Sequence, residues 1–324
     1  MRVLIILLLI FSSLRIHAGS TAQPIKDYKI YTAVCVDIKS GKSFFSLRRY
    51  ISGGKTYLLL VNPYSLETAA SASDRFKIRP ESIEKIRNEY KNTNYFKAIA
   101  RAEKNSRPLH NAGITRFSPD FHGVFITADL CPSNKALDRN FFTELIKIFD
   151  KTLNPVPVAL SLSGRWLKSH KHDFEWLTGL EKKKKISVTW INHSYNHYGN
   201  ESLPLSKNFL LKEKTGISYE ILETEKAMIN SGVAPSVFFR FPGLVSNEKI
   251  FNMITGYGLI PLGSDSWLSK EQFPKSGSII LVHANGNDPV GIQRFFKLIE
   301  INRESIAKKY WNIYDIREGA EKLK

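Results

Sequence analysis

The first buried strand of the carboxyl-terminal part of the chain reads Gly123-Val124-Phe125-Ile126-Thr127-Ala128-Asp129. It is a short apolar run that stops at a carboxylate. Continuous apolar runs of this length are typical of strands that are covered on both faces. Such strands belong to parallel sheets, in which a helix links each strand to the next. The segment therefore predicts a parallel sheet with a polar side chain at the carboxyl end of its first strand.

The same pattern continues toward the C-terminus, where apolar runs alternate with amphipathic segments. Repeated strand–helix units predict an α/β fold, with the functional site at the carboxyl ends of the strands. Further strands are expected at 157–162, 186–191, 236–239, 259–262 and 278–282, and helices at 138–150, 173–183, 218–231, 247–256 and 291–308.

The N-terminal region has a different pattern. Three strand-like runs, at 28–36, 44–47 and 56–61, are separated by glycine-containing turns, which predicts a small antiparallel sheet. Residues 80–104 carry apolar residues at helical spacing among many charges, which predicts one or two surface helices. We found no motif here that indicates a role.

The first residues have the layout of a secretory signal peptide. Arg2 gives a positive start, residues 3–11 are apolar, and small residues follow at 18–22. The apolar run is short for a membrane span, although an uncleaved anchor is the alternative. We therefore divide the chain into a signal peptide at 1–18, an N-terminal α+β region at 19–115 and a main domain at 116–324. A secreted or periplasmic protein is expected, with no stable membrane span after cleavage.

The composition favours a folded, basic protein. A 43% hydrophobic and 12% aromatic content can form a core. The formal net charge is +17, and loss of Arg2 and Arg15 with the signal peptide leaves +15. This charge suits electrostatic contact with an anionic envelope, and simple solubility explains it equally well. Nucleic acid is not an expected partner, because the lysine run at 182–185 has no interleaved aromatic residues.

Five predicted strands end in reactive side chains, namely Asp129, His193, Arg240, Asp265 and His283. The carboxyl ends of barrel strands meet on one face, so these side chains are expected to line one pocket. His193 and His197 are also four residues apart. A helical segment would place them about 5.4 Å apart along its axis, within reach of one zinc ion. The alternative is a pair of unrelated histidines.

Five short segments occur in the order of a known motif set, with Thr127-Ala128-Asp129-Leu130-Cys131-Pro132 first and His193-Ser194-Tyr195-Asn196-His197 second. Arg240-Phe241-Pro242-Gly243, Asp265-Ser266-Trp267 and Leu281-Val282-His283 follow. Together they resemble the polysaccharide deacetylase family, the NodB-homology domain of carbohydrate esterase family 4. The resemblance covers about 121–315.

The resemblance implies a distorted (β/α) barrel and the hydrolysis of C–N amide bonds, other than peptide bonds, in N-acetylglucosamine-containing polysaccharides such as peptidoglycan or chitin. It implies a divalent metal, with zinc expected. By position, the resemblance implies that His193 and His197 bind the metal. It implies that Asp129 is the general base with Arg240 as its charge partner, and that His283 is the general acid, whose pKa Asp265 raises. It places Trp267, Pro242 and Leu281 at the substrate.

The sequence departs from the family pattern beside Asp129. Leu130 stands where the family has its usual third metal ligand. Asp129 then becomes the third ligand, or water completes the shell and Asp129 stays the base. Cys131 replaces a glycine and could be a soft ligand, although we favour a buried cysteine or a disulfide with Cys35, the other cysteine of the chain.

These departures leave three functions open. The first is an active deacetylase of an envelope or extracellular polysaccharide. The second is a catalytically impaired relative that binds carbohydrate. The third is a deacylase of a small N-acyl compound.

Overall fold

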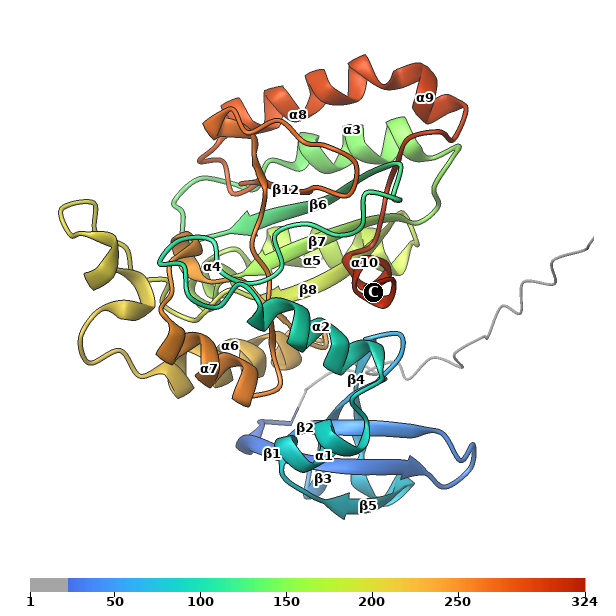
Figure 1. Ribbon diagram of the computed structural model, residues 1–324, viewed down its shortest axis with the longest axis vertical. Coiled ribbons are helices and arrows are strands. Elements are labelled where there is room, and N and C mark those ends of the chain that lie inside the picture. The colour runs from blue at the N-terminus through green and yellow to red at the C-terminus, as the bar shows by residue number, and fades with distance from the viewer. Residues whose placement is uncertain (1–22, 324) are drawn as a thin grey trace, which may run out of the picture.

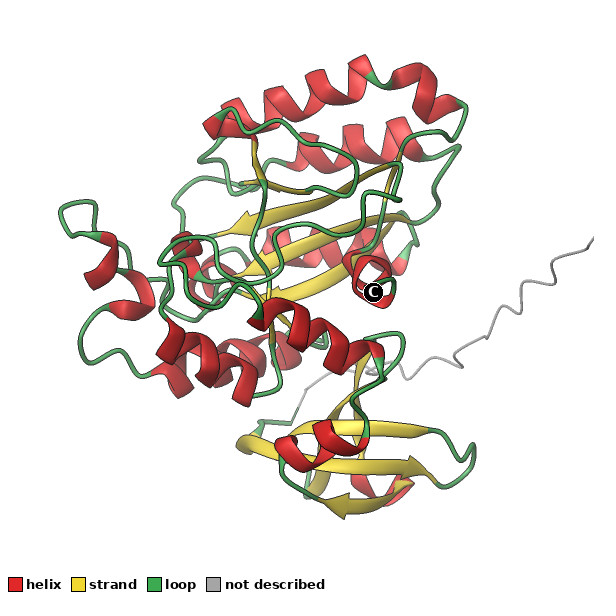
Figure 2. Ribbon diagram, in the orientation of Figure 1, coloured by secondary structure: helices red, strands yellow, loops and turns green. Residues whose placement is uncertain are grey.

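The computed structural model describes residues 23–323. The predicted signal peptide at 1–18 lies outside the described residues. None of the helices within 23–323 combines the length and apolar character that crossing a membrane requires. Figure 2 shows two separate sheets, with helices packed around the larger one.

The N-terminal sheet is antiparallel, as predicted, and has the strand order β4-β3-β2-β1-β5. Gly53 and Gly54 form the tight turn between β2 and β3, where both have positive φ angles. The two outer strands were not predicted, because they are short and carry few large apolar residues. The strands are β1 (Lys26–Asp37), β2 (Ser43–Ser52), β3 (Lys55–Val61), β4 (Thr68–Ala72) and β5 (Phe76–Pro80).

Two helices follow this sheet, α1 (Ile83–Glu89) and α2 (Asn94–Glu103). The prediction of two surface helices is only half right. α2 buries Tyr95, Phe96 and Ile99 and lies between the two sheets (Figure 1). Its amphipathic face therefore joins the N-terminal region to the main domain instead of covering the N-terminal sheet alone.

The second sheet is a curled, open barrel built on parallel strands, which confirms the predicted α/β fold. Its strand order is β10-β9-β8-β7-β6-β12-β11, and β13 pairs with the amino-terminal end of β6. The sheet does not close on itself; single bridges from 110–116 cross its open side. The strands are β6 (Gly123–Leu130), β7 (Val156–Leu162), β8 (Ile186–Asn192), β9 (Phe238–Phe239), β10 (Ile260–Pro261), β11 (Ser266–Trp267), β12 (Ile279–Val282) and β13 (Asn312–Ile313).

Helices connect these strands as predicted, with two differences. The expected helix at 291–308 is interrupted at Asn302, and a short helix after β7 was not predicted. The helices are α3 (Arg139–Phe149), α4 (Gly164–Ser169), α5 (Lys171–Lys182), α6 (Ile217–Asn230), α7 (Glu248–Gly256), α8 (Pro289–Ile301), α9 (Arg303–Ala307) and α10 (Ile316–Glu321). Short 3-10 turns lie at Ser73–Arg75, Leu205–Lys207, Phe209–Leu211, Pro242–Leu244 and Leu268–Lys270.

β6 separates two environments, because successive side chains of a strand point to opposite faces. Val124, Ile126, Ala128 and Leu130 belong to the apolar cluster beneath α3 and α8. Thr127 and Asp129 lie on the other face, toward the inside of the open barrel. The strand therefore delivers polar groups to the interior only at alternate positions.

A buried ion pair joins the N-terminal sheet to α6. Arg48 of β2 donates from Nε to Glu225 Oε2 at 2.7 Å and from Nη2 to Oε1 at 2.9 Å. Both side chains are almost completely buried, and Tyr28 donates to the same carboxylate at 2.9 Å. This contact matters for the site because α6 also carries Glu220, which holds the histidine loop.

Candidate active site

Four of the five predicted strand-end residues lie at one edge of the parallel sheet. Asp129 lies at the end of β6, His193 directly follows β8, Arg240 follows β9 and His283 follows β12. Asp129 Oδ2 is 3.7 Å from His193 Nε2. The carboxyl ends of these strands therefore form one site, as the parallel topology predicts.

The His193–His197 segment is a tight loop, not a helix, which corrects the helical geometry considered from the sequence. β8 ends at Asn192, and both Ser194 and His197 have positive φ angles, of 65° and 47°. The loop brings the two imidazole rings to a centroid distance of 4.7 Å. Proximity of the rings therefore comes from left-handed backbone positions, which an i, i+4 spacing alone does not reveal.

Glu220 of α6 holds this loop in place. Its Oε2 accepts hydrogen bonds from the backbone N–H groups of Tyr195 and Asn196, at 2.9 and 2.8 Å. Its Oε1 accepts from Asn196 Nδ2 at 2.7 Å. A buried carboxylate with three donors is a strong clamp, because hydrogen bonds to a charged group are stronger than those between neutral groups. The role of Glu220 was not predicted from the sequence, because this residue lies on a helix, α6, that carries none of the recognised motifs.

The orientation of His193 is fixed by the chain itself. Its Nδ1 is 2.8 Å from the carbonyl oxygen of Arg240, and a carbonyl only accepts, so Nδ1 carries the hydrogen. Nε2 then faces the site, 3.5 Å from Cys131 Sγ. Histidines that bind a metal through one ring nitrogen usually donate the hydrogen of the other nitrogen to a carbonyl or carboxylate oxygen.

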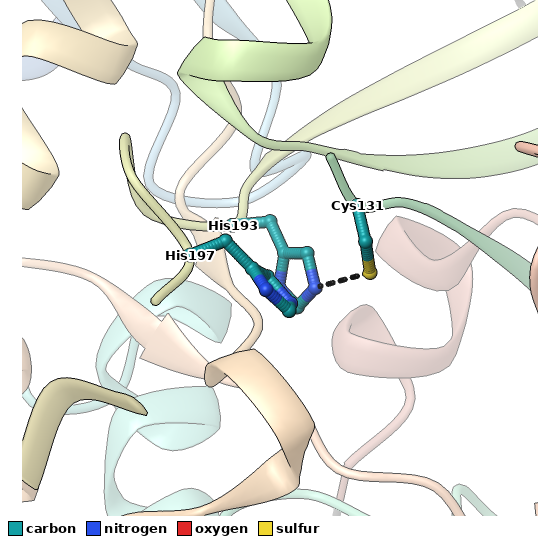
Figure 3. A group of neighbouring side chains, drawn as sticks. All are labelled: Cys131, His193 and His197. Atoms are coloured by element: carbon teal, nitrogen blue, oxygen red, sulfur yellow. Dashed lines mark hydrogen bonds between the residues drawn. The ribbon is translucent and has the colours of Figure 1, made fainter. Parts of the chain in front are cut away.

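Three side chains gather here with the chemistry of a metal site (Figure 3). Single ligand atoms of Cys131, His193 and His197 lie within 4.8 Å of one another. Ligands of a tetrahedral zinc ion are about 3 to 4 Å apart, given bond lengths near 2.0 to 2.3 Å. Within the described chain, the buried His197 Nε2 has no hydrogen-bond partner, which leaves this nitrogen available to bind a metal. The residues thus fit a divalent metal.

Both cysteines of the described chain are free thiols, so the disulfide that we favoured as one reading of Cys131 is wrong. Cys35 lies inside the N-terminal sheet, in a cluster with Leu58, Leu60 and Phe76. Burial raises the pKa of Cys131, but the neighbouring His197 and His193 outweigh this effect and hold that pKa well below its ordinary value.

Asp129 is a buried carboxylate next to the cluster. Burial raises the pKa of Asp129, yet the positive charges of Arg240, His193 and His283 outweigh it and lower that pKa. Among the described residues, none donates a hydrogen bond to its Oδ1. Arg240 acts on it at a distance: its Nη2 donates to Thr127 Oγ1 at 2.9 Å, while Nε and Nη1 are unpartnered within the described chain. The expected charge pair is therefore not a direct hydrogen-bonded contact.

The carboxylate beside His283 is Asp288, not Asp265, which corrects the predicted origin of the His283 pKa. His283 Nδ1 is 3.5 Å from Asp288 Oδ2. Burial lowers the pKa of His283, but Asp288, Cys131 and Asp129 together raise it to about 10. Trp267 lies beside the same imidazole, with ring centroids 5.8 Å apart.

Asp265 has a different environment because it precedes a strand instead of ending one. The run at 259–262 stops at Pro261, and Asp265 directly precedes β11. Its carboxylate accepts from Ser278 Oγ and the Ile279 N–H, both at 3.0 Å, at the amino end of β12. His283 follows the opposite end of that strand. Asp265 therefore stabilises the sheet edge, and its predicted catalytic role remains a prediction.

The two apolar residues predicted at the substrate are both buried. Leu281 lies within β12, and Pro242 lies in the turn that follows Arg240. They can form the floor of a pocket, and their contact with a substrate stays a prediction.

An open groove lies beside the histidine loop. It has a volume of about 1140 Å³ and runs past Tyr195 and Asn196. Lys135, Arg165 and Lys168 line it, and none of the three makes an ion pair with another described residue. The groove therefore carries positive charge that the described chain does not neutralise.

Comparison with known proteins gives the following. No family model matches the chain. The chain is similar to solved family 4 carbohydrate esterases. They include a CE4 family pseudoenzyme from Bacillus anthracis, with 16% identity over 65% of this chain and 70% of that one and a TM-score of 0.46. A family 4 carbohydrate esterase from Bacillus anthracis has 15% identity over 68% and 89%, with a TM-score of 0.46. PdaA, a family 4 carbohydrate esterase from Bacillus subtilis, has 12% identity over 68% and 86%, with a TM-score of 0.45.

Proposed function

We propose that this protein is a metal-dependent hydrolase that removes N-acetyl groups from an N-acetylglucosamine-containing polysaccharide of the envelope or the extracellular space. The observation that carries the proposal is the arrangement at the strand ends. A metal-competent histidine pair lies beside a buried carboxylate, Asp129, and His283, whose side chain is 20% exposed, follows the neighbouring strand β12. Amide hydrolysis needs an activated water, polarisation of the carbonyl and a proton for the leaving amine.

Each residue has a role in this proposal. A divalent metal held by His193 and His197, with zinc expected, would supply Lewis-acid polarisation of the acetyl carbonyl. Asp129 accepts a proton from the attacking water through its free Oδ1. His283, oriented by Asp288, donates a proton to the departing amine. Arg240 is a positioning residue, because its carbonyl orients His193 and its charge keeps Asp129 ionised.

The surroundings favour a polymer over a small substrate. The groove beside the histidine loop is open, with a volume of about 1140 Å³, and Tyr219 also lines it. Trp267 beside His283 is the proposed wall for the acetyl methyl group. The N-terminal apolar run at 3–11 supports export, so we place the protein in the periplasm or outside the cell.

Acetate release from chitin oligomers and from peptidoglycan tests the proposal. We expect release by zinc- or cobalt-loaded protein and a loss on the order of 10²-fold or more in His193→Ala. His172→Ala is the matched control, because the His172 side chain is 96% exposed and lies outside the site. A metal-loaded protein that binds these glycans but releases no acetate would support the carbohydrate-binding alternative instead.

A further inference from the structure

We propose that Cys131 is the third metal ligand of this site, so that one thiolate and two imidazoles hold the ion while Asp129 stays outside the coordination shell. The inference deepens the proposed function and rests on it for the presence of a metal. It assigns a sulfur ligand to a position where the family resemblance implies an oxygen ligand one residue earlier.

The alternation of β6 selects Cys131 over its neighbour. Leu130 points into the apolar cluster under α3, so residue 130 cannot face the histidines in this register. The next residue returns to the face that carries Asp129. Both Asp129 Oδ2 and Cys131 Sγ approach the same atom, His193 Nε2, at 3.7 and 3.5 Å. The end of β6 and the residue that directly follows it thus offer two donors to the site, a carboxylate and a thiol.

Hydrogen bonds from two other segments hold the backbone at Leu130 and Cys131, and with it the base of the thiol side chain. Asn285 Nδ2, which is buried, donates to the Cys131 carbonyl at 3.0 Å. Ser163 Oγ donates to the preceding carbonyl of Leu130 at 3.0 Å. Pre-oriented ligands of this kind lose little conformational entropy when they bind a metal.

Ligand atoms of Cys131, His193 and His197 all lie within 4.8 Å of one another, and this group of three does not include Asp129. His197 Nε2 has no other partner in the described chain. Asp129 Oδ1 is also unpartnered, which leaves this carboxylate available to take a proton. Leu130 cannot be the third ligand that the family resemblance implies at its position. If Cys131 is that ligand, Asp129 does not have to bind the metal and can act as the base alone.

The chemistry of the donor set defines the class of metal. A cysteine coordinates a metal as its thiolate, so the Cys131 ligand is a soft, anionic sulfur. Sulfur and imidazole donors suit zinc and cobalt, whereas magnesium, calcium and manganese prefer oxygen. We therefore expect the site to bind zinc or cobalt and to discriminate against manganese.

The same short contact would also suit a metal-free thiol–imidazole pair, in which Cys131 is a nucleophile. In that case, the thiol attacks the acetyl carbonyl, the amine leaves with a proton from an imidazole, and water hydrolyses the resulting thioester. The two arrangements differ in what the thiol does when metal is added, which makes them separable.

Cobalt spectroscopy of the full chain is the direct test. We expect one equivalent of Co²⁺ to produce a near-ultraviolet thiolate-to-cobalt charge-transfer band in the wild type. The band should persist in Cys35→Ala, which leaves Cys131 as the sole thiol, and be absent in Cys131→Ser. Cys131→Asp should still bind cobalt but without the band, which keeps the test valid if the serine variant fails to fold. Cobalt bound to wild type without this band would overturn the proposal.

Two further measurements test that Cys131 binds the metal and that Asp129 does not. In Cys35→Ala, stoichiometric zinc should slow alkylation of Cys131 by iodoacetamide by at least about tenfold; an unchanged rate favours the nucleophile reading and overturns the metal assignment. Asp129→Asn should retain cobalt and the band, and loss of both would place Asp129 in the shell. Acetate release is scored separately: a band without acetate leaves the ligand assignment standing and removes the proposed function.

Discussion

At the scale of single residues, polar contacts from neighbouring groups orient the site residues and set their charge. The Arg240 carbonyl fixes which nitrogen of His193 faces the site, and Asp288 takes the place that the sequence suggested for Asp265. The histidine pair, Asp129, Arg240 and His283 could be predicted from strand-end positions. Asp288, Asn285 and Glu220 could not, because they contact the site from a loop or a helix without a fixed spacing.

Replacing Asp288 tests the orientation of the general acid. We expect Asp288→Asn to lower kcat by roughly 10²-fold, because His283 loses the carboxylate that holds its imidazole. Cobalt affinity and the charge-transfer band should not change, since Asp288 does not contact the histidine pair. The variant Asp265→Asn should change kcat less than Asp288→Asn does. The reverse order in the kinetics would restore the role predicted for Asp265.

At the scale of elements, α6 connects the structural core to the histidine loop. The long, strongly periodic elements matched prediction closely, as with α3 and β7. The two-residue strands β9, β10 and β11 are too short for a pattern to bound them. That shortness explains why Asp265 was placed at the end of a strand: no pattern in the sequence indicates that a new two-residue strand begins directly after it.

Glu220 provides the test at this scale. We expect Glu220→Ala to leave the backbone N–H groups of Tyr195 and Asn196 unpaired, at a cost of about 1 to 3 kcal/mol each if they stay buried. The loop should open, so cobalt affinity falls by tenfold or more and both amides exchange faster with deuterium. Glu223→Ala, on the same helix but paired only with Lys226, is the control. Equal cobalt affinity in the two variants would show that the loop holds itself.

At the scale of the whole molecule, a shared apolar cluster, α2 and the buried Arg48–Glu225 ion pair are among the contacts that join the N-terminal sheet to the open barrel. The sequence divided the chain into regions of different pattern, but it could not show that Arg48 reaches Glu225, 177 residues away. We expect Arg48→Ala to lower the free energy of unfolding by about 3 to 5 kcal/mol, because Glu225 is left charged and buried. Urea unfolding measures this, and the double variant with Glu225→Gln should recover part of the loss. A change below about 1 kcal/mol would mean that water reaches the pair.

The role of the basic residues that line the groove can also be tested at this scale. Changing Lys135, Arg165 and Lys168 together to glutamine should raise KM for carboxylate-bearing peptidoglycan more than KM for neutral chitin oligomers. The difference between the two substrates should shrink as salt is added, because exposed charges are screened. Equal effects on both glycans, independent of salt, would mean that the groove serves solubility and not substrate binding.

Acetate release on removal and return of metal tests the central proposal most directly. The full chain, freed of metal by chelation and assayed on N-acetylglucosamine oligomers and peptidoglycan, should release no acetate above background. One equivalent of zinc or cobalt should restore release in the wild type and in His172→Ala, but not in His193→Ala. Release that continues undiminished in the metal-free protein, or no release from any of these glycans after metal is bound, would contradict a metal-dependent deacetylase.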